Sequence, residues 1–484
     1  MNNKVFNNFV WRFLERWGAQ GVTLIVGLVL ANILGPKVYG SIALVTVFTA
    51  ILQVFVDSGL GTALIQKKDA DDLDFSSVFW FNICVCVLLY LLMFLCAPAI
   101  ATLYNRPELV PVIRVLSLII IISGVKNIQQ SYVGKNLLFK KFFFATLGGT
   151  LGAAVVGITM ALLGFGVWAL VAQTLFNATV DTLILWITVK WRPKREFSFH
   201  RFKKLFSYGW KILASSLINT FYNELRSLII GAYYSSEDLA FYNKGSQFPK
   251  YAVENINSSM NSVLLPVLSK MQGDIDAVRA ATRRVIRCSS YIIWPLMIGL
   301  CLVSDKLILV LLNEDWLPAS VFLKIICFNQ VLQPLQTTNL SVIKAMGFAD
   351  KHLKIEIIKK LIAIAIVIIS SLMGVEAIAI GSVIYAIIAS FINAYPNKKL
   401  IQYSYYNQIK DIFPFIVMSS VMALFVYFAG KVPLSTVFSL IFQIVVGIVV
   451  YFLISLFTGS EELKYYMGVI ASVKNGLGKK GEKN

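Results

Sequence analysis

Residues 243–261 read NKGSQFPKYAVENINSSMN, a stretch whose polar side chains recur at steps of three and four. Such steps place side chains on one face of an α-helix, and the opposite face here carries Phe248, Val253 and Ile256. The polar face consists of Asn243, Gln247, Lys250, Glu254, Asn257 and Asn261. In a soluble protein this pattern is typical of a surface helix, so its meaning depends on whether the chain lies in a membrane.

The composition of the chain indicates a membrane protein. Its 484 residues are 57% hydrophobic, with a mean hydropathy of +0.73. Many apolar runs of roughly 18 to 25 residues are long enough to cross about 30 Å of hydrocarbon. We therefore predict an all-α polytopic membrane protein with about 14 transmembrane helices. The first ends near Leu34, a turn at Gly35–Gly40 leads into the second, and single helices cover about 109–133 and 319–346.

Several functional classes are disfavoured by residue usage. The six cysteines lie in or at the edge of apolar runs, which argues against disulfide and zinc frameworks. Both histidines, His200 and His352, lie in basic loops, so a histidine-ligated metal centre is not expected. The sequence contains no glycine-rich phosphate-binding loop, so ATP hydrolysis is not expected, and no cofactor is predicted. The net charge of +19 is spread over short connecting loops, which argues against a nucleic-acid partner.

The basic residues instead predict topology. If residues 243–261 cross the membrane and the N-terminus is cytoplasmic, 30 of the 44 lysines and arginines fall in cytoplasmic segments, 10 lie within helices and 4 fall on the outer side. The ones on the outer side are Lys37, Arg106, Lys306 and Lys431. If this helix did not cross, every later loop would invert. We therefore expect a multi-pass membrane protein with both termini in the cytoplasm, and the polar stripe inside the bilayer.

Polar groups inside a bilayer usually mark function. A charged residue at a helix centre costs roughly 2.5 to 3.5 kcal/mol on insertion scales, and it normally faces a bundle interior or a wet cavity. The candidate substrate-binding residues are Arg12, Arg16, Lys126, Asn219, Asn223, Arg226, Asn243, Gln247, Lys250, Asn257 and Asn261. Lysine and arginine predominate among the charged groups, so the enclosed space should suit an anionic ligand. The alternative is internal ion pairing, for instance between Lys250 and Glu254 one turn on.

The chain also shows signs of an internal duplication. The turn at residues 34–40 corresponds to residues 234–240, and both turns are expected on the outer side. This predicts two parallel six-helix lobes related by a pseudo-two-fold axis along the membrane normal, with a substrate site between them. The predicted parts are a first lobe (1–190), a basic amphipathic linker on the membrane surface (191–207), a second lobe (208–397), two accessory helices (398–458) and a cytoplasmic tail (459–484).

Several short motifs resemble one family along most of the chain. They are Leu34-Gly35-Pro36 with Tyr39-Gly40, Asp57-Ser58-Gly59-Leu60-Gly61-Thr62-Ala63-Leu64-Ile65-Gln66, Gly166-Val167-Trp168-Ala169-Leu170, Leu239-Ala240-Phe241-Tyr242-Asn243-Lys244 and Leu265-Pro266-Val267-Leu268-Ser269. In this order they resemble the polysaccharide-synthesis branch of the multidrug, oligosaccharidyl-lipid and polysaccharide exporter superfamily, which includes O-antigen, colanic acid and teichuronic acid exporters. The usual Gly-Leu-Tyr is Ala240-Phe241-Tyr242 here, a mild departure.

The resemblance implies two lobes forming a V and the flipping of an undecaprenyl-diphosphate-linked oligosaccharide across the inner membrane. The polyprenyl tail is soluble in hydrocarbon, so the protein needs to shelter only the head group. Lys250 and Arg226 are the leading candidates for the diphosphate, and the amide side chains for sugar hydroxyls. Asp57, Glu224 and Glu254 are candidates for coupling to a proton or sodium gradient. A polysaccharide polymerase, chain-length machinery and membrane lipids are candidate partners.

Two other functions remain open. A drug or cation exporter of the same superfamily would favour an acidic, aromatic-lined cavity, against which the lysine and arginine surplus argues. A membrane enzyme, such as an O-antigen polymerase, would be expected to carry a long outer loop with catalytic groups. The longest outer segment, about residues 304–318, is short for that purpose. A transporter, not an enzyme, is therefore the prediction.

Overall fold

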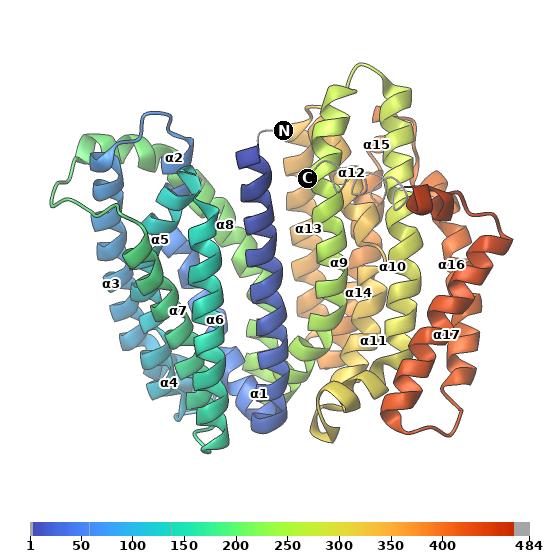
Figure 1. Ribbon diagram of the computed structural model, residues 1–484, viewed down its shortest axis with the longest axis horizontal. Coiled ribbons are helices and arrows are strands. Elements are labelled where there is room, and N and C mark those ends of the chain that lie inside the picture. Colours follow the sequence, from blue (N-terminus) through green and yellow to red (C-terminus); the bar gives the residue numbers. More distant parts are fainter. Residues whose placement is uncertain (1–2, 58, 137, 469–484) are drawn as a thin grey trace, which may run out of the picture. The chain divides into compact units, whose positions relative to one another are not determined.

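Apolar helices dominate the computed structural model, which describes residues 3–57, 59–136 and 138–468 and contains no β-strand within them (Figure 1). The chain forms two compact units, Met1–Ala240 and Phe241–Asn484. The helices up to the division are α1 (Asn3–Asp57), α2 (Leu60–Gln66), α3 (Asp72–Leu103), α4 (Leu109–Leu116), α5 (Leu118–Lys135), α6 (Phe139–Leu162), α7 (Val167–Thr188) and α8 (Phe199–Tyr233). The division falls in the first turns of α9 (Ser236–Lys270) and places α8 in the first unit, whereas the sequence predicts a second lobe from residue 208.

The second unit continues after α9 with further helices and one short 3₁₀ turn, η1. These elements are α10 (Ile275–Leu311), η1 (Glu314–Trp316), α11 (Ala319–Gln330), α12 (Gln333–Ala345), α13 (Ala349–Ser370), α14 (Val375–Ala394), α15 (Asn397–Leu400), α16 (Tyr405–Ala429) and α17 (Thr436–Phe457), followed by a helical stretch over residues 461–468.

Helix α1 contains the predicted break between the first two spans. Gly35 has a φ of 71° and a ψ of 173°, and Pro36 follows it. Glycine adopts a positive φ without a Cβ clash, and proline has no N–H to continue the helical ladder, so this pair separates two helical segments. The helix resumes at once after Gly35, and the O–H of Tyr39 donates to the carbonyl of Gly27 across the break at 2.9 Å. The predicted turn is therefore confined to Gly35.

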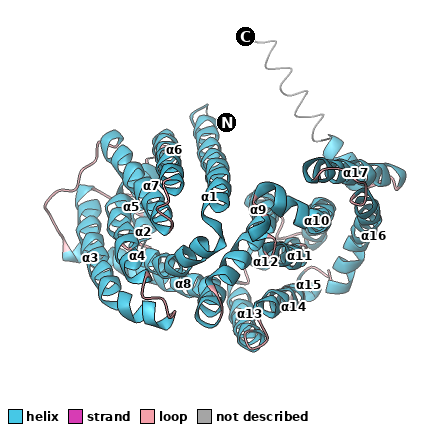
Figure 2. Cartoon of the chain, turned by 90° about the horizontal axis from the view of Figure 1, so that it is seen from below, coloured by secondary structure: helices cyan, strands magenta, loops and turns pink. Residues whose placement is uncertain are grey.

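The first unit packs around its long helices. Helices α1, α5, α6 and α7 contact one another, and α3 packs against α5 (Figures 1 and 2). At one end, Phe75 and Phe79 on α3 meet Trp191, with ring centroids 5.6 and 6.4 Å apart, and Phe202 of α8 joins the same buried cluster. These contacts join the beginnings of α3 and α8 to the segment that precedes α8.

Only part of the predicted amphipathic linker is helical. Residues from Phe199 onward form the first turns of α8, whereas residues 189–198 form no helix. Their backbone is instead held by side chains of the first unit. The N–H of Lys194 donates to Ser76 and that of Ser198 to Ser77, both at 2.9 Å, and Gln129 donates to the carbonyl of Trp191 at 3.0 Å. Helix begins only at Phe199, as the first turn of α8.

An ion pair holds the same end of the unit. Asp71 caps α3 and binds the guanidinium of Arg201 on α8. This hydrogen bond lowers the pKa of the Asp71 carboxyl to about 2. Lys67 binds the fully buried carboxylate of Asp74 at 2.5 Å, so Lys67 after α2 and Arg201 of α8 are both paired with acidic residues at the start of α3.

The accessory helices α16 and α17 are attached to α10 by polar contacts in the second unit. The O–H of Tyr291 donates to Ser455 at 2.9 Å, and that of Tyr451 donates to the carbonyl of Tyr291 at 2.8 Å. Near the opposite end, Lys306 donates to the carbonyl of Gly430 at 3.0 Å. In Figure 1, α16 and α17 lie side by side next to α10.

A buried amide network joins α12, α15 and α16. Asn339 donates to Gln408 at 2.7 Å, and Asn397 donates to Asn339 at 2.6 Å. All three side chains are fully buried. Because a buried amide without partners is costly, this network fixes the position of the α15–α16 segment.

Nine segments of the described chain are long and apolar enough to cross a membrane, which confirms a polytopic all-α membrane protein. The most apolar are α3 and α17, each with a mean hydropathy of 2.7. The remaining predicted spans correspond to the second half of α1 and to α8, α9, α11 with α12, and α13. The single helices predicted over 109–133 and 319–346 are each two helices, α4 with α5 and α11 with α12.

Candidate functional site

The polar stripe lies on α9, which is helical from Ser236 to Lys270. Its opposite face packs within the second unit. A Cβ on Gly245 would lie 2.3 Å from the carbonyl oxygen of Ala319, so α9 approaches α11 at backbone distance, and Tyr242 meets Phe322 with ring centroids 5.8 Å apart. Val253 is fully buried. This packing directs the polar face of α9 away from the core of its unit.

Exposure along the stripe is graded. Lys250 and Glu254 are exposed, Asn243 and Gln247 are half-buried, and Asn257 is buried. Gln247 donates to the hydroxyl of Tyr251 at 3.1 Å. The side chain of Asn261 lies outside the described residues, so its role in substrate binding stays a prediction.

The expected alternative for the stripe was an ion pair between Lys250 and Glu254. Within the part of the chain that the structure describes, neither side chain has a hydrogen bond or an ion pair. Their charges are therefore available to a ligand. An exposed ammonium flanked by amide side chains is suited to an anion that also carries hydroxyl groups.

The predicted residues on α8 lie in the first unit. Asn219 and Asn223 are exposed, and Glu224 and Arg226 are half-buried. The guanidinium of Arg226 lies over the ring of Tyr222, with its carbon 5.9 Å from the centroid. The side chains of Arg12 and Arg16, which also belong to the predicted set, lie outside the described residues.

Lys126 has a partner that sequence reasoning missed. Its ammonium on α5 lies 2.9 Å from a carboxylate oxygen of Asp181 on α7, and the two side chains are only 18% and 11% exposed. The other oxygen of Asp181 is buried and has no hydrogen-bond partner among the described residues. An acidic residue in the middle of an apolar run is itself a signal of an intramembrane functional group, and that signal was present at Asp181.

The neighbouring residue, Asn127, binds Asp57 of α1. Its amide donates to the Asp57 carboxylate at 3.0 Å and to the carbonyl of Val56 at 3.1 Å. Asp57 is the last residue of α1, where Gly59, with a φ of 64°, separates α1 from α2. Two consecutive residues of α5 therefore connect to ionisable groups on α1 and α7. This arrangement holds one predicted substrate residue and one predicted coupling residue.

The sequence matches the model of one known protein family. A family model described as "Polysaccharide biosynthesis protein" matches residues 29–321, which is more than half of the chain. The match includes the whole polar stripe of α9 together with Asp57, Lys126, Asp181, Glu224 and Arg226, whereas Arg12 and Arg16 precede it.

Curated relatives have related names. The teichuronic acid biosynthesis protein TuaB of Bacillus subtilis is 30% identical over 309 residues, which is 62% of this chain and 63% of that protein. The succinoglycan biosynthesis transport protein ExoT of Rhizobium meliloti is 25% identical over 344 residues, 71% of this chain and 69% of that protein. The lipopolysaccharide biosynthesis protein WzxC of Escherichia coli is 23% identical over 406 residues, 81% of this chain and 82% of that protein.

Solved transporter structures share the fold. The lipid II flippase MurJ, in an inward closed conformation, superposes with a TM-score of 0.76 at 17% identity, covering 93% of this chain and 98% of that one. An inward-facing MATE family multidrug transporter gives a TM-score of 0.62 at 16% identity, covering 79% and 94%. At these identities the likeness concerns the fold alone. With a family model matching over residues 29–321, this chain belongs to the polysaccharide biosynthesis protein family.

Proposed function

We propose that this protein is a flippase that moves an undecaprenyl-diphosphate-linked oligosaccharide across the bacterial inner membrane by alternating access, for surface polysaccharide assembly. The observation that carries the proposal is the α9 stripe, where exposed Lys250 has no partner among the described residues and lies among amide side chains. Relatives named for polysaccharide biosynthesis and transport support it, as does the fold shared with a lipid II flippase. The chain is a transporter, not an enzyme.

The chemistry of the substrate explains this residue set. A diphosphate joined to sugars is insoluble in hydrocarbon, whereas its polyprenyl tail is at home there. The protein must supply hydrogen bonds and positive charge to the head group alone. Lys250 would offer a compact ammonium and Arg226 a planar fork to the diphosphate, and the amides of Asn219, Asn223 and Asn243 would meet sugar hydroxyls.

The rest of the predicted site has more varied support. Gln247, Asn257 and Asn261 extend the amide series along α9, and Arg12 and Arg16 would add positive charge at the start of α1. Lys126 is already bound to Asp181, so it would contact a substrate only by leaving that carboxylate. We propose that Lys126, through this ion pair, holds α5 against α7 within the first unit.

Coupling to an ion gradient would use the intramembrane carboxylates. Asp57, Glu224 and Glu254 are the proposed coupling residues, and Asp181 joins them because one of its oxygens is buried without a hydrogen-bond partner among the described residues. Protonation of such a group changes the charge of its neighbourhood, which can bias a two-state transporter.

Orientation and partners follow from the same function. We propose that both termini are cytoplasmic, because the basic loops then lie inside. The oligosaccharide would be handed to a polysaccharide polymerase and its chain-length machinery on the outer side. A multidrug or cation exporter is the second candidate, favoured by the fold shared with MATE transporters and disfavoured by the exposed, basic Lys250 on α9.

The direct test is to delete the gene and identify what accumulates. Mass spectrometry of extracted lipids should find an accumulated undecaprenyl-diphosphate oligosaccharide, with a parallel loss of surface polysaccharide. Normal surface polysaccharide together with sensitivity to cationic dyes would instead support the drug exporter.

A further inference from the structure

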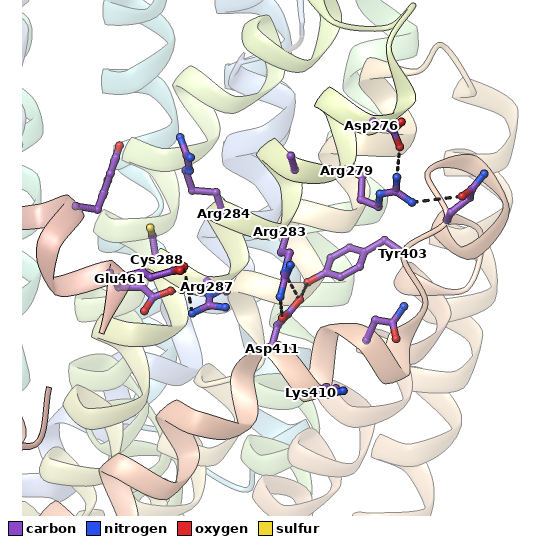
Figure 3. A pocket seen from close by; sticks show the side chains of 15 residues that line it. Asp276, Arg279, Arg283, Arg284, Arg287, Cys288, Tyr403, Lys410, Asp411 and Glu461 are labelled. Carbon is purple, nitrogen blue, oxygen red and sulfur yellow. Dashed lines mark hydrogen bonds and ion pairs between the residues drawn. The ribbon is translucent and has the colours of Figure 1, made fainter. Parts of the chain in front are cut away.

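The basic end of the second unit contains a pocket of about 1090 Å³. It is lined by the first turns of α10, the segment between α15 and α16, the start of α16 and the helical stretch over residues 461–468 (Figure 3). All of these elements belong to one unit. The sequence pattern attributed the arginines here to membrane topology alone, so the proposed transport function leaves the pocket without a role.

Ion pairs build the walls of this pocket. Arg283 binds both oxygens of Asp411, at 2.9 and 2.6 Å, and the O–H of Tyr403 donates to the same carboxylate at 2.7 Å. Burial and this hydrogen bond raise the pKa of Tyr403. Arg287 binds Glu462 at 2.6 Å. Because α16 and residues 461–468 are thereby tied to α10, the pocket is held open by fixed side chains.

Two cations in the lining remain without such partners. Arg284 and Lys410 are exposed, and the structure gives neither a hydrogen bond nor an ion pair among the described residues. Figure 3 shows the two side chains on opposite sides of the Arg283–Asp411 pair, each without an interaction. Asp276, Asp411 and Glu462 are bound to the other arginines and Glu461 is the fourth carboxylate of the lining, so the lining as a whole has one positive charge in surplus.

We propose that this pocket binds phosphate groups, with Arg284 and Lys410 as separate contacts on the two sides of the Arg283–Asp411 pair. Arg283 uses only two of the five N–H donors of a guanidinium on Asp411, so further donors remain in the same wall. Phosphate is supplied at this position either by the headgroup of an anionic phospholipid or by a soluble anion. The basic end of a membrane protein faces the cytoplasm, where the anionic phospholipids of the inner leaflet attract lysine and arginine. Tyr403 and Tyr465 in the lining are of the kind found at headgroup level.

The test uses the full chain purified in detergent. Native mass spectrometry measures the affinity for short-chain phosphatidylglycerol and, as the neutral-headgroup comparison, phosphatidylcholine. A parallel arm measures the shift of melting temperature with inorganic phosphate. The variant Arg284→Gln with Lys410→Gln removes two charges and breaks no ion pair of the described residues. The control, Lys354→Gln with Lys399→Gln, removes two exposed charges of the same unit outside the pocket.

The expected result is a loss of about tenfold or more in phosphatidylglycerol affinity for the pocket variant and little change for the control. Arg284→Lys with Lys410→Arg should bind nearly as the wild type does. If inorganic phosphate stabilises the wild type but not the pocket variant, while lipid affinity is unaltered, the phosphate comes from a soluble anion. Equal binding of both ligands by wild type and pocket variant would overturn the proposal. The melting temperature without ligand, expected to be equal in all variants, shows that they fold.

Discussion

Lys126 on α5 and Asp181 on α7 form an ion pair across 2.9 Å inside the first unit. Its neighbour Asn127 binds Asp57 of α1, so one turn of α5 joins two other helices. A buried pair of this kind contributes little net stability as a pair, but loss of one partner leaves an uncompensated charge. Substitutions at this pair can therefore distinguish a structural role of Lys126 from a role in substrate binding.

Lys126→Gln should lower the amount of inserted protein, because the nearly buried Asp181 carboxylate loses its cation at a cost of about 3 to 5 kcal/mol. Asp181→Asn should do the same from the other side. Adding Asp181→Asn to Lys126→Gln should restore abundance, measured as fluorescence of a fused reporter after size-exclusion chromatography. A Lys126→Gln protein that inserts normally yet fails to export would instead assign Lys126 to the substrate.

Gly40→Ala should destabilise the first unit. A Cβ at Gly40 would lie 1.8 Å from the backbone oxygen of Ser236, so the start of α9 would have to move. Gly21→Ala is the matched control on the same helix, because a Cβ there meets no described atom within 4 Å. Alanine is favoured over glycine in a helix by about 1 kcal/mol, so Gly21→Ala should be neutral or stabilising in a thermal melt. Equal melting of the two variants would contradict the close contact.

The sequence predicted those features that depend on local periodicity. The apolar runs indicated the helices, Gly35-Pro36 indicated the break in α1, and the spacing from Asn243 to Asn257 indicated a continuous polar face on α9. Each follows from residues within a few turns of one another. The structure therefore retains them with small shifts of boundary.

Contacts between distant segments could not be predicted in this way. Asp181 lies 55 positions from Lys126, and no local pattern links them. The aromatic and basic residues at 199–206 do form a helix, the start of α8, whereas residues 189–198 before them do not. The backbone N–H groups of Lys194 and Ser198 donate to Ser76 and Ser77 of α3, contacts that no local pattern indicates.

Asp71→Asn should reduce stability at neutral pH by at most about 1 kcal/mol, because the lost pair with Arg201 is half-exposed. Asparagine still caps α3, so only the charge is removed. The folded pKa of Asp71, about 2, lies below its ordinary value of 3.8, so its contribution is complete above pH 4 and is lost as the pH falls towards 2. The difference in melting temperature between wild type and variant should shrink over that interval. A constant difference would show that the charge is not its cause.

Pro433→Cys, in the exposed connection between α16 and α17, should react with a membrane-impermeant maleimide added to intact cells. Lys399→Cys on α15 should react only after the membrane is opened, because basic segments face the cytoplasm. Both positions are exposed, so accessibility to the reagent depends on the side of the membrane. The reverse labelling pattern would invert the proposed orientation.

Lys250→Gln should leave the level of inserted protein nearly normal and sharply reduce export. Lys250 is exposed and has no partner among the described residues, so its removal leaves no buried charge behind. The diphosphate, in contrast, would lose a charge-assisted contact, and the lipid-linked precursor should accumulate in the inner leaflet.

Lys250→Arg should retain part of the activity, because the charge persists while its reach and geometry differ. Lys270→Gln, in the last turn of the same helix and outside the polar stripe, removes an exposed charge of the same sign and controls for general disturbance of α9. The decisive quantity is surface polysaccharide per molecule of inserted protein. Normal export by Lys250→Gln at normal abundance would remove Lys250 from the substrate site, and the positive charge for the diphosphate would then have to come from Arg226 and the start of α1.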